Sequence, residues 1–192
     1  MSRPFVIIDL EATCDERRFP RDQMETIEIG AVLVDADTLA PIDTFQTFVK
    51  PVVRPWLTPF CTQLTHITQA DVDAAEVFPF AIDALAAWLP GPTIFGSWGA
   101  YDKLQLLQDA RRHGIDLPLD TAHHFNVKNA FAKATNTRRC GMAAALKRAG
   151  LTLEGTHHRG LDDARNITKL LPFALGRSSL VDSAPKKRRS RR

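Results

Sequence analysis

The chain has 192 residues, which is enough for one globular domain with a sizeable core and short for two. Apolar residues make up 44% and charged residues 24%, both ordinary for a globular domain. The formal net charge is +3, yet the last eight residues, 185–192, carry six positive charges, which leaves 19 basic and 22 acidic residues in 1–184. The sequence therefore predicts a mildly acidic domain with a basic tail.

Several classes of protein are excluded by the same composition. No apolar stretch approaches the roughly 18 residues of a membrane span, so we expect no membrane partner. The first apolar run ends at Asp9 and is too short for a signal peptide. Cys14, Cys61 and Cys140 are far apart and form no Cys-x-x-Cys pair, which argues against a disulfide scaffold or a zinc ribbon. We expect a cytoplasmic protein, or a nuclear one if the source is eukaryotic.

The first half of the chain is dominated by strand patterns. Apolar runs predict strands over 5–10 and 27–34, and an alternating run predicts a third over 42–49. The short connection between the last two indicates an antiparallel hairpin. Residues 51–75 are rich in proline and polar side chains, so we expect an irregular stretch with short helical turns there.

The second half mixes helices with short strands. Short strands are expected over 93–96 and 124–127, and the chain turns polar and then basic from Arg177. We therefore expect a domain over 1–176 and a disordered tail over 177–192. The order of elements favours an α/β domain with a mixed central sheet. The spacing of apolar side chains predicts helices over 76–89, 101–113, 129–134, 141–149 and 161–171.

A pair of carboxylates ends the first predicted strand. Asp9 and Glu11 are two residues apart, so their side chains face the same side of the strand. A solvated strand edge is one interpretation of such a pair. The four apolar residues that precede it favour a buried strand, where two carboxylates need a neutralising partner. Mg²⁺ prefers carboxylate oxygens and is the natural one.

Two more groups of this kind follow. Asp102 lies in the first turn of the helix predicted over 101–113, where the helix dipole alone would also favour an acid. His158 precedes the helix predicted over 161–171, and Asp163 lies inside it, so the two side chains can reach one ligand from different directions. Each group alone has a structural interpretation, but the ordered set favours a single site.

The strings that contain these residues resemble the DEDDh-type 3′→5′ exonucleases, and most of all the branch of histone-mRNA and small-RNA 3′ exonucleases. The resemblance extends over roughly residues 5–173. His66 stands where the family usually carries Gly. Related animal enzymes also carry a separate RNA-binding module, which we expect this short chain to lack, so the choice of substrate stays open. The strings are VIIDLEATCD (6–15), IEIGAV (27–32), FVKP (48–51), LTHIT (64–68), SWGAYD (97–102) and HRGLDDARNI (158–167).

The resemblance implies both a fold and a chemistry. The fold would be ribonuclease H-like, with a mixed central sheet flanked by helices on both faces. Asp9, Glu11, Asp102 and Asp163 would hold two Mg²⁺ or Mn²⁺ ions, and His158 would be the general base. Four carboxylates match the charge of two divalent cations, and without metal they would repel one another and raise some of their pKa values.

Contacts with the substrate are implied by family position. The backbone at Ala12 and Thr13 would lie near the terminal nucleotide, and Leu64 and Thr65 would meet its base or ribose. Trp98 would either stack on a base or simply pack in the interior. Other residues near these strings, among them His157, the pair at 123–124 and Cys14, are expected to be loop or packing residues.

The expected substrate is single-stranded nucleic acid, with RNA favoured by the resembling branch. The alternatives are a DNA-directed 3′→5′ exonuclease of the proofreading or repair type, and a non-catalytic nucleic-acid-binding module that uses the basic tail. The sequence leaves the oligomeric state open. The tail would attract a polyanion through Lys186, Lys187, Arg188, Arg189, Arg191 and Arg192.

Overall fold

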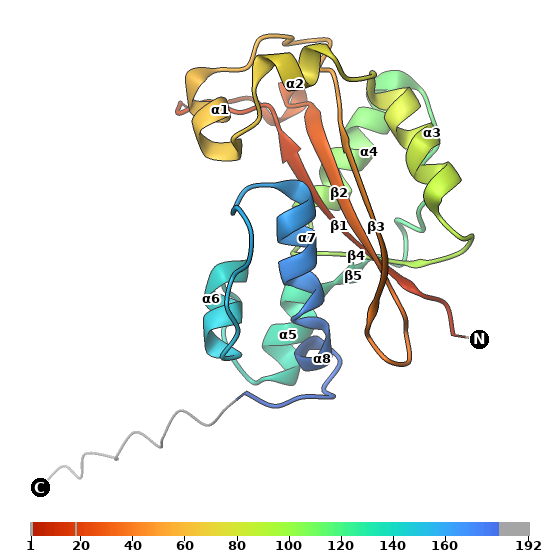
Figure 1. Cartoon of the computed structure of the whole chain (residues 1–192), viewed down its shortest axis with the longest axis vertical. Coiled ribbons are helices and arrows are strands. Elements are labelled where there is room, and N and C mark those ends of the chain that lie inside the picture. The colour runs from red at the N-terminus through yellow and green to blue at the C-terminus, as the bar shows by residue number, and fades with distance from the viewer. Residues whose placement is uncertain (1, 18, 181–192) are drawn as a thin grey trace, which may run out of the picture.

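The computed structural model describes residues 2–17 and 19–180. Within these residues the centre is a five-stranded sheet in the order β3-β2-β1-β4-β5, so β1 lies in the middle (Figure 1). Helices cover both faces, which confirms the predicted α/β fold with a mixed central sheet. The strands are β1 (Phe5–Ala12), β2 (Thr26–Val34), β3 (Pro41–Phe48), β4 (Ile94–Ser97) and β5 (Phe125–Asn126).

Two groups of helices pack on the sheet. α3 and α4 share a core with Val6 and Ile8 of β1, whereas α5, α6, α7 and α8 share the opposite core with Ile7 of the same strand. α1 and α2 lie beyond the carboxyl end of β1 (Figure 1). The helices are α1 (Pro59–Thr65), α2 (Gln69–Asp73), α3 (Phe78–Trp88), α4 (Tyr101–His113), α5 (Val127–Ala134), α6 (Met142–Arg148), α7 (Gly160–Thr168) and α8 (Leu171–Ala174), with a short 3-10 helix η1 (Arg21–Gln23).

The central position of β1 explains its sequence. Val6, Ile7 and Ile8 are all fully buried, because consecutive side chains point into the two different cores. Burying a side chain of this size stabilises the fold by about 1.5–3 kcal/mol. β1 runs antiparallel to β2 and parallel to β4. The carboxyl ends of β1 and β4 therefore lie at the same edge of the sheet, which brings the segments after both strands together.

A close approach of two backbones fixes α7 on the sheet. A Cβ atom added to Gly30 of β2 would lie 2.0 Å from the carbonyl carbon of Gly160, the first residue of α7. A Cβ added to Gly160 would lie 3.0 Å from the carbonyl oxygen of Asp9. A side chain at Gly30 is therefore excluded, and one at Gly160 would force the neighbouring backbone to shift by a few tenths of an ångström. This close contact places the start of α7 directly over the end of β1.

The predicted helix over 161–171 is confirmed over 161–168 but ends earlier than expected. α7 ends at Thr168, and α8 begins at Leu171 with Pro172 in its first turn. A proline has no N–H, and its ring clashes with the carbonyl of the residue four positions earlier. For Pro172 that residue is Thr168, which is where α7 stops. The strand predicted over 124–127 is shorter than expected. It contains Phe125 and Asn126, and the Asn126 side chain already caps α5.

The end of the described chain still contacts the domain. Arg177 donates hydrogen bonds to the carbonyl oxygens of Asp37 and Ala36 at 2.8 and 3.0 Å, and Leu180 packs against the core. The domain boundary at residue 176 stays a prediction, and the basic residues 186–192 lie outside the described residues. Within the described ranges, none of the helices has the length and apolar character needed to cross a membrane.

Candidate active site

The five residues predicted to carry the chemistry line one hollow of about 310 Å³. Asp9, Glu11, Asp102, His158 and Asp163 all border it, although they come from three separate parts of the chain. Ligand oxygens of Asp9, Glu11 and Asp163 lie within 4.8 Å of one another, so these three can share an ion. The structure thus brings together every residue of the predicted catalytic set.

Asp102 is held at the edge of this cluster. It lies in the first turn of α4, directly after β4, and is 4% exposed. Its Oδ1 accepts a hydrogen bond of 3.2 Å from the backbone N–H of Leu10, which lies between Asp9 and Glu11 on β1. This bond ties α4 to the strand that carries the other two carboxylates, and it follows from the parallel pairing of β1 and β4.

A buried glutamate that was not among the predicted site residues holds the start of α7. Glu28 of β2 is fully buried and accepts hydrogen bonds from the Gly160 N–H at 3.0 Å, from Arg159 Nε at 3.2 Å and from Gln46 Nε2 at 2.5 Å. Gly160 follows the two histidines of the site, so Glu28 positions their loop. The signal in the sequence was a single acid inside an otherwise apolar strand.

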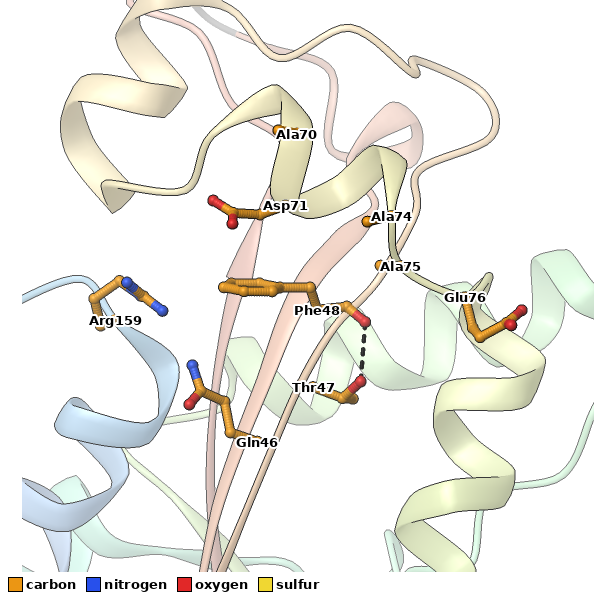
Figure 2. A pocket seen from close by; sticks show the side chains of 9 residues that line it. All are labelled: Gln46, Thr47, Phe48, Ala70, Asp71, Ala74, Ala75, Glu76 and Arg159. Atoms are coloured by element: carbon orange, nitrogen blue, oxygen red, sulfur yellow. Dashed lines mark hydrogen bonds between the residues drawn. The ribbon is translucent and has the colours of Figure 1, made fainter.

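Gln46 and Arg159, which both donate to Glu28, also line a second hollow of about 750 Å³. Figure 2 shows it between β3, α2 and the start of α7, with Arg159 and Gln46 at one side and the Phe48 ring between them and α2. The Arg159 guanidinium lies 5.4 Å from the centre of the Phe48 ring. Arg159 is also paired with Glu28. This hollow therefore lies behind the loop that carries His157 and His158, which we call the catalytic loop.

The electrostatics of the cluster are those of crowded, buried acids. Burial, and then repulsion from Asp102 and other neighbouring carboxylates, raises the pKa of Asp9 well above its ordinary value. Burial and the neighbouring carboxylates raise the pKa of Glu11 to about 9. Burial also raises the pKa of Asp102, to about 6, and the pKa of Asp163. Each carboxyl therefore resists ionisation unless positive charge is supplied.

This donor set fits divalent metal ions. Carboxylate oxygens are the ligands that Mg²⁺ and Mn²⁺ prefer, and a cation removes the repulsion that raises these pKa values. Asp9, Glu11 and Asp163 would be the core of such a site because their oxygens already converge. Asp102 borders the same hollow and would complete it.

The two histidines of the site lie side by side in one turn. His158 borders the hollow as predicted, with a left-handed backbone (φ 64°) and its N–H donating to Asp163 Oδ2 at 3.0 Å. His157 was expected to be a loop or packing residue, and it does lie in the turn, but it also contacts the acids. Its Nδ1 lies 2.8 Å from Asp163 Oδ2, and its ring stacks on that of His158 with centroids 4.0 Å apart. The left-handed residue turns the chain so that both imidazoles face the acids.

Four of the residues predicted to contact the substrate lie outside the lining of the hollow. Ala12 and Thr13 are buried beyond Glu11, and Thr13 exchanges hydrogen bonds of 2.8 and 3.0 Å with the backbone of Glu25. Leu64 and Thr65 lie at the end of α1, where the Thr65 hydroxyl donates to Cys61 O. These four residues are outside the lining of the hollow, and their contact with a nucleotide stays a prediction.

Trp98 borders the hollow but is also engaged in packing. Its Nε1 donates to the Cys140 carbonyl oxygen at 3.2 Å, and its ring lies 6.0 Å from that of Phe131. The packing alternative is therefore seen directly. Stacking on a base would have to use the part of the indole that faces the hollow, and it stays a prediction.

Comparison with known proteins identifies the family to which the chain belongs. A family model described as Exonuclease (RNase_T) matches residues 6–171. The chain belongs to this exonuclease family. Among solved structures, the nuclease domain of 3′hExo, a DEDDh family member bound to rAMP, matches with a TM-score of 0.82 and 30% identity over 90% of this chain and 91% of that one. The predicted DEDDh resemblance and ribonuclease H-like fold are both confirmed.

Other relatives place this exonuclease family member near named RNA exonucleases. A 3′-exonuclease solved with a histone mRNA stem-loop has a TM-score of 0.84 and 28% identity, and it matches 91% of this chain and 64% of that chain. Human 3′-5′ exoribonuclease 1 is 31% identical over 85% of this chain and 50% of its own length, and the fruit-fly 3′-5′ exonuclease Snipper is 30% identical over 86% and 67%. The chain spans about half the length of the mammalian relatives. DEDDh enzymes depend on divalent metal ions, in agreement with the acidic cluster.

Proposed function

We propose that this protein is a 3′→5′ exonuclease that releases nucleoside 5′-monophosphates from single-stranded nucleic acid, with RNA as the preferred substrate. The observation that carries the proposal is the convergence of Asp9, Glu11, Asp102, His158 and Asp163 on one hollow in a chain of the exonuclease family. A non-catalytic binding module would have no need to bring four acids and a histidine together against their mutual repulsion.

Each group has a definite task in the proposed reaction. The four carboxylates would hold two Mg²⁺ or Mn²⁺ ions, which would supply electrostatic stabilisation of the charge that develops in an in-line displacement at phosphorus. His158 takes the proton from the attacking water as general base. Glu28 and the hydrogen bond between the His158 N–H and Asp163 fix the loop that carries the base.

The preference for RNA is supported by the relatives. The mammalian relatives are named exoribonucleases, and one structural neighbour was solved with a histone mRNA stem-loop. The competing substrate is single-stranded DNA, for which this chain offers the same metal chemistry. Metal chemistry at the four carboxylates is the same for RNA and DNA, so the choice between the two substrates depends on the walls of the site.

Matched RNA and DNA oligonucleotides test the proposal. With a 5′ label and Mg²⁺, we expect a ladder that shortens from the 3′ end, faster on RNA, and no products in EDTA. Asp163→Asn should stop the reaction, whereas Asp83→Asn on the exposed side of α3 should not. A mobility shift without shortening would support the binding module, and a faster ladder on DNA would reverse the substrate preference.

A further inference from the structure

We propose that a basic ridge beside the acidic hollow binds the phosphates of the single strand upstream of its 3′-terminal nucleotide. This inference rests on the proposed function and adds a binding surface to it. The ridge lies on α5, α6 and the loop between them. It consists of Lys128, Lys133, Arg138, Arg139, Lys147 and Arg148.

The charge of this segment is unlike that of the rest of the domain. Residues 121–153 contain six Lys or Arg residues and no Asp or Glu, whereas residues 1–120 and 154–184 together contain 13 basic and 22 acidic ones. The positive charge of the protein is thus concentrated in two places, the tail and this internal segment. A sequence of 33 residues without one acid presents a field of a single sign, which is suited to a polyanion.

The cations of the ridge are available for a ligand. Lys133, Arg138, Arg139, Lys147 and Arg148 are exposed, and Lys128 is half-buried. Within the described part of the chain, no ion pair joins any of the six to a carboxylate. Arg148 instead donates to the Arg138 carbonyl oxygen at 2.9 Å, which ties α6 to the loop.

A hollow in the ridge gathers hydrogen-bond donors. It has a volume of about 630 Å³ and is bordered by Lys133, Arg138 and Arg139 together with the polar side chains of Asn129 and Thr137. Cationic and neutral donors of this kind make most of the contacts that proteins form with nucleic-acid phosphates. No carboxylate borders this hollow among the described residues, so a phosphate would meet no repulsion there.

The ridge continues directly into the wall of the acidic hollow. Gly141 and Met142, which follow Arg139 by two and three residues, border the same hollow as Asp9 and Asp163. At the other end of the segment, a Cβ added to Gly99 would lie 3.4 Å from Lys128 Nζ, and Gly99 stands between Trp98 and Asp102. A strand whose 3′ end reaches the carboxylates can therefore pass onto the ridge without crossing an acidic surface.

This arrangement divides the work between two charges. The hollow must be acidic to hold cations and cannot itself attract a polyanion before they bind. The ridge supplies that attraction at a fixed place, and its position next to Gly141 sets the direction in which the strand leaves the site. Because each neutralised phosphate releases counterions, the contribution of the ridge must fall steeply with salt.

The experiment measures binding of the full-length protein to 5′-labelled single-stranded RNA in EDTA, so that no cleavage occurs. Fluorescence anisotropy gives Kd for a 12-mer over a range of salt concentrations. A parallel assay with Mg²⁺ gives the rate of dinucleotide cleavage. The ridge variant is Arg138→Ala/Arg139→Ala. The matched control is Arg3→Ala/Arg111→Ala, which removes the same charge from two exposed arginines elsewhere. Thermal unfolding confirms that each variant is folded.

We expect the ridge variant to bind the 12-mer about 25-fold more weakly at 0.1 M salt and to lose about 1.4 from the slope of log K against log salt, which is about 0.7 for each of two phosphates. Dinucleotide cleavage with Mg²⁺ should be unchanged because a dinucleotide does not reach the ridge. Arg138→Lys/Arg139→Lys should keep most of the affinity for the 12-mer because a point charge suffices for a phosphate. Equal losses of affinity in the ridge variant and its control, or an unchanged slope of log K against log salt, would overturn the proposal that the ridge binds phosphates. The ladder with Mg²⁺ on the same RNA separates the two proposals. No RNA binding in EDTA together with a normal ladder would overturn only the ridge, whereas no ladder with Mg²⁺ would overturn the proposed function.

Discussion

The acidic hollow and the basic ridge both gather like charges, but by opposite means. The acids come from β1, α4 and α7, which are distant in sequence, and they are largely buried. The cations come from one continuous segment and stay largely exposed. Buried like charges raise each other's pKa values strongly, whereas exposed ones are screened by water and salt. Changes in the hollow should therefore have large, metal-dependent effects, and changes on basic surfaces should have smaller, salt-dependent ones.

The largest effect is expected from a single carboxylate of the hollow. Asp163→Asn removes a charge that the metal ions require, so the rate of nucleotide release should fall by about 1,000-fold or more. In EDTA the same variant should be more stable than the wild type because one repelling buried acid is gone. The rate is measured on labelled RNA and the stability by thermal unfolding. Wild-type activity in this variant would show that the metal ions do not bind in the hollow.

The next largest effect is expected from the general base. His158→Ala should lower the rate by about 100- to 1,000-fold and leave the stabilisation by Mg²⁺ in thermal unfolding intact, because the proposed reaction assigns the proton to the imidazole and the metal ions to the carboxylates. His157→Ala is the matched comparison, since its ring stacks on that of His158. If His157→Ala loses more rate than His158→Ala, the two histidines must exchange roles.

The buried acids also predict how stability depends on pH. The pKa of Glu11 rises from about 4.5 to about 9 on folding, so the folded state holds this proton more tightly. The stabilisation of the folded state by this bound proton is complete below about pH 4.5. It is lost as pH rises toward 9, by up to about 1.4 kcal/mol of unfolding free energy per pH unit. Unfolding temperatures measured in EDTA from pH 6 to 9 should therefore fall. Glu11→Gln should flatten that decline, and a stability that rises with pH in both proteins would contradict the crowding of acids.

Glu28 offers a way to loosen the hollow without touching its lining. Glu28→Gln keeps an acceptor for the Gly160 N–H but removes the ion pair with Arg159, and should cost about 2 kcal/mol of unfolding free energy. Denaturant unfolding measures this value. Glu76→Gln, an exposed acid on the outer hollow, should change it by less than about 0.5 kcal/mol. Equal costs for the two variants would mean that Glu28 does not position the catalytic loop.

The smallest effect is expected from the tail. Deletion of residues 185–192 should weaken binding of single-stranded RNA at low salt and leave the single-turnover rate at saturating protein unchanged, because the tail adds only screened, long-range attraction. A loss of the single-turnover rate would contradict this separation between attraction and chemistry.

Local patterns predicted much of this protein because they report on burial along one element. The apolar run of β1 and the helical spacing of α4 were predicted nearly to their ends, and the strings around Asp9 and His158 identified the chemistry. The break between α7 and α8 was missed because helical spacing continues through it, although Pro172 carried the signal. The contact of His157 with Asp163 was not predicted because it is made in a turn that contains a left-handed residue, which spacing does not show.

The sequence by itself determined the kind of fold and the set of chemical groups, since both depend on residue types at short spacing. Only the tertiary structure decided how these groups meet. The parallel pairing of β1 with β4 brings Asp102 to the other carboxylates, and the contact of Gly30 with Gly160 brings Asp163 to Asp9. The basic segment 121–153 can be read in the sequence, but only the structure places it beside the acids. Contacts between distant segments depend on packing of the whole chain, and no local pattern contains them.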